Sequence, residues 1–158
     1  MAVKNAEEAL ARHLANASSQ KRLLGELAVA LGLPQPPERI EIYDNSHIQG
    51  KHAVGGMVVA GPEGFQKAAY RRFNIKDEGK FATQTGDDFA MMRQVMHRRF
   101  SRALKEDPDR LSGSWPDLLL IDGGLGQLSS VHEVLDALAI TDMQVVAISK
   151  GPDRHAGR

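Results

Sequence analysis

The sequence contains no cysteine, so disulfide bonds and zinc sites built on thiolates are excluded. It also lacks any apolar run near the roughly 20 residues that a membrane-spanning helix needs. Its first residues, MAVKNAEEAL, have no apolar segment of the kind that marks a secretory signal. These absences favour a protein of the reducing cytoplasm that has no membrane partner.

Net charge is absent as well, because 20 basic side chains balance 20 acidic ones. Neutrality by itself argues against nucleic acid binding. The basic residues are nevertheless concentrated in two segments without an acid, KAAYRRFNIK (67–76) and RQVMHRRFSR (93–102). From charge alone two interpretations stay open: a local phosphate-binding face, or solvated surfaces balanced by nearby acids.

Length and hydrophobic spacing predict a helical lead segment and one globular domain. The chain has 158 residues, of which 42% are hydrophobic and 25% charged, enough to bury a core. Leucines recur at helical spacing over residues 5–31, with Asn5 as the N-cap, and the prolines of LGLPQPPER then end the helix. We therefore expect a helical segment at residues 1–33 and the core domain at residues 38–158.

The core domain is predicted to have the order β-β-β-α-β-α-β. Strands at 39–44, 54–60 and 68–75 are separated by turns rich in Gly and Pro, which is typical of an antiparallel meander. The remaining elements are a helix over 87–104, a strand buried on both faces at 118–122, a helix carrying Leu128 to Leu138, and a strand at 143–149.

Two aspartates lie late in core strands of this order. In IEIYDNSH, Ile40 and Ile42 face one side of the first strand, and alternation puts Asp44 on that same apolar side. Asp122 ends the buried strand LLLID. If the two strands are adjacent and parallel, the carboxylates lie side by side and repel each other unless a cation lies between them. The pair therefore predicts a Mg²⁺ or Mn²⁺ site of the kind that cleaves phosphodiesters.

Spacing alone leaves the roles of the neighbouring residues open. Asp87 and Asp88 begin the second predicted helix, where one acid caps the first turn and the other is free to face the sheet end. Two interpretations of Ser46 and His47 stay open: they are loop residues that hydrogen-bond to the backbone, or they are catalytic residues. His97 lies in the basic helix and is expected to face phosphate or solvent.

The segment IDGGLGQLS supports a second hypothesis, a nucleotide-binding turn. Gly124, Gly126 and Ser129 approach the dinucleotide-binding fingerprint, but three meander strands precede them and Asp142 comes too early for the ribose-binding acid. We prefer the interpretation that these glycines let the chain turn beside Asp122 and leave room for a metal or a phosphate. An interaction module without chemistry is a third hypothesis.

Five motifs resemble, in order, the C-terminal endonuclease half of the UvrC family: YDNSHIQG, YRRFNIK, GDDFAMMRQVMHRRF, PDLLLIDGGLGQL and AISKGPDRHAG. The resemblance covers residue 37 to the last residue. It implies an α/β fold of the RNase H-like type and a metal-dependent DNA endonuclease that makes the 5′ incision in nucleotide excision repair. It further implies Mg or Mn as the cofactor, damaged DNA as the substrate, and UvrB as partner, with UvrA upstream.

The resemblance also implies roles for single residues. Asp44, Asp88 and Asp122 match the family's catalytic acids, and we expect Asp44 and Asp122 to hold the metal. Leu125 stands where the family's loop usually has a lysine, which puts a phosphate contact there in question. The candidates for contacts to the DNA backbone are Arg71, Arg72, Arg98, Arg99 and Lys150.

Several parts of the family's full protein have no counterpart in this sequence. They are the catalytic histidine downstream of the last motif, the helix–hairpin–helix repeats, the N-terminal nuclease and the segment that docks on UvrB. We therefore expect a domain truncated at its C-terminal end, able to bind metal but nearly inactive alone.

Overall fold

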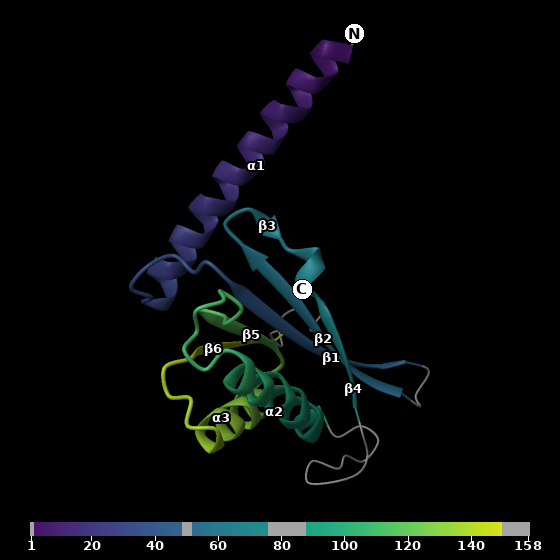
Figure 1. Cartoon of the computed structure of the whole chain (residues 1–158), viewed down its shortest axis with the longest axis vertical. Coiled ribbons are helices and arrows are strands. Elements are labelled where there is room, and N and C mark those ends of the chain that lie inside the picture. The colour runs from purple at the N-terminus through teal and green to yellow at the C-terminus, as the bar shows by residue number, and fades with distance from the viewer. Residues whose placement is uncertain (1, 49–51, 76–87, 150–158) are drawn as a thin grey trace, which may run out of the picture.

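The computed structural model describes residues 2–48, 52–75 and 88–149, which form a long helix, a sheet and two further helices (Figure 1). The elements are α1 (Ala2–Leu31), β1 (Ile40–Ile48), β2 (His52–Gly61), β3 (Gly64–Phe65), η1 (Lys67–Ala69), β4 (Arg71–Asn74), α2 (Asp88–Glu106), β5 (Leu118–Asp122), α3 (Leu125–Ala137) and β6 (Gln144–Ile148).

The predicted order β-β-β-α-β-α-β is confirmed, with one short strand added. The added strand is β3, which pairs with the end of β2 across a tight turn where Gly64 has a φ of 102°. The third predicted strand is shorter than expected, because residues 67–69 form the 3₁₀ turn η1 before β4 begins.

Within the described residues, six strands form one mixed sheet in the order β3-β2-β1-β5-β6, with β4 also paired to β2. β1 and β2 are antiparallel, as are β2 and β4, so the predicted meander is confirmed. β5 runs parallel to both β1 and β6. The antiparallel half and the parallel half therefore meet at β1.

Helices cover both faces of the sheet. The larger core lies under α2 and α3 and includes Leu119 and Ile121 of β5. The smaller core lies on the opposite face, where Leu24 of α1 packs with Ile40 and Leu118. β5 thus contributes to both cores, as its continuous apolar sequence predicted.

The N-terminal helix differs from its prediction at its start. It begins at Ala2, so Asn5 lies within the helix and is not its N-cap. Its C-terminus is a Schellman motif, in which Gly32 has a φ of 69° and the N–H of Leu33 donates to the Ala28 carbonyl at 2.8 Å. Figure 1 shows the N-terminal turns extending away from the sheet. No described helix, α1 included, is apolar enough over its length to cross a membrane.

Candidate active site

Asp44 and Asp122 lie next to each other at the end of the β1–β5 pair. These strands run parallel with Tyr43 opposite Ile121, so the next register position holds the two aspartates. Partial loss of hydration raises the pKa of Asp44, and the charge of Asp122 together with a hydrogen bond between the two side chains raises it further. The adjacency predicted from the sequence is confirmed.

The environment of Asp44 differs from its prediction. Asp44 is exposed to solvent and does not lie among buried apolar side chains. β5 ends at Asp122, whereas β1 continues to Ile48 in a ribbon with β2 alone. The acid pair therefore lies where the parallel part of the sheet stops.

The chemistry of this pair fits a hard divalent cation. Both side chains offer carboxylate oxygens, and Mg²⁺ is commonly held by one or two carboxylates while waters and substrate phosphates complete its coordination. In the described ranges, no group of three or more His, Cys, Asp or Glu side chains is arranged to hold a metal. A divalent cation bound at this end of the strand pair would therefore be held by these two carboxylates.

The other candidate catalytic residues lie outside this pair. Asp88 is the first residue of α2 and is exposed, and it does not complete a three-residue metal group. Asp87 lies outside the described residues. Ser46 and His47 continue β1, with His47 opposite Ala53 of β2, so their prediction as loop residues is wrong.

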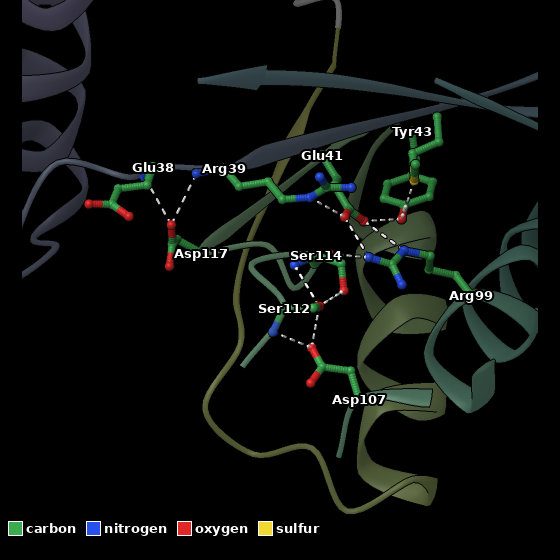
Figure 2. Close-up of polar contacts among 10 residues, drawn as sticks. Glu38, Arg39, Glu41, Tyr43, Arg99, Asp107, Ser112, Ser114 and Asp117 are labelled. Carbon is green, nitrogen blue, oxygen red and sulfur yellow. Dashed lines mark hydrogen bonds and ion pairs between the residues drawn. The ribbon is translucent and has the colours of Figure 1, made fainter. Parts of the chain in front are cut away.

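A carboxylate at the opposite end of the same strand pair helps to set its register. Asp117 accepts hydrogen bonds from the backbone N–H groups of Glu38, at 2.8 Å, and of Arg39, at 3.0 Å (Figure 2). Its own N–H donates to the Arg39 carbonyl at 2.8 Å. These bonds join the beginnings of β1 and β5. A register fixed there also fixes which residues lie opposite each other at the far end, and so it places Asp44 beside Asp122.

Protein side chains lie close to two glycines in the segment that follows Asp122. A Cβ at Gly123 would lie 2.4 Å from Cγ of Gln127, and a Cβ at Gly126 would lie 2.4 Å from Cζ of Phe89. Close packing therefore favours glycine at both positions. The prediction of room for a metal or a phosphate concerned Gly124 and Gly126. It is wrong for Gly126, where Phe89 takes up the space, whereas a Cβ at Gly124 would meet nothing within 4 Å. The nucleotide-binding hypothesis loses support at Gly126, because Phe89 takes up the space that a phosphate would need beside this glycine.

Known proteins resemble this chain along its length. A sequence profile described as the UvrC RNase H endonuclease domain matches residues 28–158. The chain belongs to this family. UvrABC system protein C of Rhodospirillum rubrum is 62% identical over 157 residues, and that of Sphingopyxis alaskensis is 61% identical over 157 residues. Each alignment covers 99% of this chain and 24% of the relative, so the chain spans about a quarter of the length of these relatives.

A solved structure shares the fold of this UvrC domain. Endonuclease V of Ciona intestinalis, in complex with a 24mer DNA containing an inosine followed by a ribo-adenosine, superposes with a TM-score of 0.50 and 13% sequence identity. The superposition covers 92% of this chain and 59% of the other. This likeness concerns the fold alone. With the family assignment, it confirms the predicted RNase H-like α/β fold.

Three of the arginines predicted to contact DNA lie on the surface of the UvrC domain. Arg71 and Arg72 are exposed on β4, and Arg98 is exposed on α2. The Arg98 guanidinium donates to the Asn74 carbonyl at the end of β4. That bond places the basic parts of α2 and β4 on one surface. Lys150 lies outside the described residues.

The fourth arginine, Arg99, has a different role. Only 5% of its surface is exposed. Its Nε and Nη2 donate to the carboxylate of Glu41 at 3.2 and 2.7 Å, and Nη2 also donates to the Ser114 carbonyl at 2.6 Å (Figure 2). A buried guanidinium with these partners does not reach a phosphate, so the predicted DNA contact of Arg99 is wrong.

Glu41 is the buried acid of β1, and the sequence-based predictions missed it. It is 0% exposed and also accepts hydrogen bonds from the hydroxyl of Tyr43 and from Nε of Arg39, the latter at 3.0 Å. Burial and the nearby Glu41 charge raise the pKa of Tyr43 well above its ordinary value, so its hydroxyl stays protonated and donates. The alternation in IEIY was the available signal, because it places Glu41 and Tyr43 on the same face.

Proposed function

We propose that this chain is the catalytic domain of a metal-dependent DNA endonuclease that hydrolyses phosphodiester bonds. The adjacency of Asp44 and Asp122 at the exposed end of the β1–β5 pair carries this proposal. Two ionised carboxylates in that position destabilise each other, and a divalent cation relieves the repulsion. When bound, Mg²⁺ or Mn²⁺ supplies Lewis acidity and lowers the pKa of a coordinated water.

The chain's own residues then have distinct tasks. Asp44 and Asp122 hold the cation through their carboxylate oxygens. Asp88 acts from the start of α2 by orienting a water, since the three acids do not form one metal-binding group. Arg71, Arg72 and Arg98 bind phosphates along the DNA backbone. Such contacts position the duplex without reading its sequence. Lys150 is a further candidate.

The similarity to UvrABC system protein C supports a biological role for this activity. As part of such a protein, the domain makes the 5′ incision beside a lesion during nucleotide excision repair in the cytoplasm. Its partners are damaged DNA and UvrB, with UvrA acting earlier. Damage recognition in this proposal belongs to those partners, and this domain contributes the cleavage.

Calorimetric titration with Mn²⁺ tests the acid pair. The unmodified chain is expected to bind Mn²⁺. Asp44→Asn and Asp122→Asn are each expected to abolish binding without changing the circular dichroism spectrum. The matched control is Asp136→Asn, which changes an exposed aspartate of α3 and is expected to bind normally. Mn²⁺ binding that survives both changes at the pair would rule out this site.

Cleavage of bubble or nicked DNA in the presence of Mn²⁺ tests the chemistry. We expect slow cleavage that depends on Asp44. A longer UvrC chain that includes the family's downstream histidine should cleave faster, because losing a general acid or base costs about 10²–10⁴-fold in rate. Cleavage that persists in Asp44→Asn would contradict the proposal. Fast cleavage by the short chain would show that the acids suffice without the histidine.

A further inference from the structure

Two buried amides lie behind the acid pair without hydrogen-bond partners. Both polar atoms of the Asn45 amide, Oδ1 and Nδ2, are shielded from solvent and unpaired, and so is Oε1 of Gln127. In the described part of the chain these are the buried side-chain nitrogen and oxygen atoms that lack a partner. Buried polar atoms are nearly always paired, with protein or with ordered water, so each exception needs an explanation.

The strand register brings the two amides to one place. Tyr43 lies opposite Ile121, so Asn45, two residues further and on the same face, reaches the level of Gly123. Gln127 packs on Gly123, because a Cβ there would lie 2.4 Å from its Cγ. Both amides therefore lie near the level of Gly123, on the same face of the sheet.

This place lies directly behind the acids. Asn45 follows Asp44 in the chain, and Gly123 follows Asp122. Because consecutive strand residues point to opposite faces, the amides lie on the face under α2 and α3, and the carboxylates lie on the other. A bridge between Asn45 and Gln127 therefore ties together the two backbone segments that carry the acids.

The space and the chemistry favour a water molecule as that bridge. A Cβ at Gly55 would lie 3.1 Å from Oδ1 of Asn45 and 2.4 Å from Cγ2 of Val95. The packing on that side is therefore too close for a molecule larger than water. The amides are neutral, and a water molecule can accept a hydrogen bond from Nδ2 of Asn45 and donate one to Oε1 of Gln127.

We propose that Asn45 and Gln127 share one ordered water and are positioning residues for Asp44 and Asp122. Nδ2 of Asn45 donates to the water, and the water donates to Oε1 of Gln127. The shared water holds the ends of β1 and β5 at a fixed separation, and so it holds the carboxylates at the separation that a divalent cation needs. The positioning role rests on the proposed function, whereas the shared water does not.

A double-mutant cycle tests the shared water. Asn45→Leu and Gln127→Met each replace one amide by an apolar side chain of similar size, and each leaves the other amide buried and unpaired. In metal-free buffer, each single variant should lower the melting temperature by several degrees. The double variant removes both amides, so its loss should be clearly smaller than the sum of the two single losses.

Mn²⁺ titration of the same three variants tests the positioning role. Each should bind Mn²⁺ several-fold more weakly than the unmodified chain. The matched control is Gln94→Met, which changes a buried glutamine of α2 that has an interaction of its own. This control should leave the Mn²⁺ affinity unchanged, whatever its effect on the melting temperature.

The outcomes separate the two proposals. Additive losses of melting temperature would overturn the shared water. Unchanged Mn²⁺ affinity in all three variants would overturn the positioning role while the acid-pair site stands. If the unmodified chain binds no Mn²⁺, the proposed function fails and the positioning role fails with it. The melting temperatures then still decide whether the amides share a water.

Discussion

Replacing Arg99 by methionine should destabilise this UvrC domain without weakening DNA binding by the folded molecules. Arg99 and Glu41 are 5% and 0% exposed and are joined by bonds of 3.2 and 2.7 Å, so the change leaves a buried carboxylate without its main partner. Breaking a buried ion pair from one side costs about 3–5 kcal/mol. Arg39 still faces Glu41 at 3.0 Å, so we expect the lower end of that range. For a chain of this size, a loss of about 3 kcal/mol lowers the melting temperature by roughly 6–12 °C.

Thermal and urea denaturation of Arg99→Met measure this loss directly. Adding Glu41→Leu should recover most of it, because apolar residues in place of a buried ion pair are often neutral or stabilising. Arg102→Met is the matched control, since Arg102 is exposed on the same helix and forms an ion pair with Glu106, which is also exposed. An Arg99→Met variant that keeps its melting temperature but loses DNA affinity would refute the structural role of Arg99 and restore a phosphate contact.

Two further predictions concern the acid pair and the basic surface. The folded-state pKa of Asp44 is raised above its unfolded value of about 3.9, so the stability of the wild type is unaffected below that pH and falls as pH rises through the folded pKa. In metal-free buffer, the melting temperature of Asp44→Asn should therefore rise relative to wild type as pH increases above about 4, and a difference independent of pH would contradict this. Changing Arg71 and Arg72 to glutamine should reduce the slope of log K against log salt for duplex DNA by up to about 1.8, measured by fluorescence anisotropy. Arg22→Gln, exposed on α1, should not change that slope, and equal slopes in both variants would place the DNA surface elsewhere.

The fold followed from the sequence where hydrophobic periodicity decides the structure. The strand at residues 118–122 lies where it was predicted, because a run buried on both faces has a clear beginning and end. Its parallel pairing with β1 also placed Asp122 beside Asp44. The length of β1 was harder to predict. It continues past Asp44 because β2 supplies hydrogen bonds there, and a partner strand cannot be recognised from the residues of β1 alone.

The prediction for Arg99 was wrong because it rested on the number of basic residues in the segment and not on their positions around the helix. In the segment RQVMHRRFSR every arginine looks equally available to a phosphate. Helical periodicity separates them, since Arg99 lies four residues after Val95 and four before Ala103, both of which are buried. This spacing indicates an inward side chain. It does not identify Glu41 as the partner, because that residue lies 58 positions away in the chain.

The packing of α1 has a practical consequence for producing this domain. Leu24 and Ala28 are buried, and Leu24 covers Ile40 and Leu118 on the face of the sheet away from α2. A recombinant fragment that starts at residue 38 would uncover this apolar surface and should aggregate during purification. A start near residue 20 keeps the covering turns and omits those that extend from the sheet. The second half of α1 therefore belongs to the smallest fragment that should remain in solution.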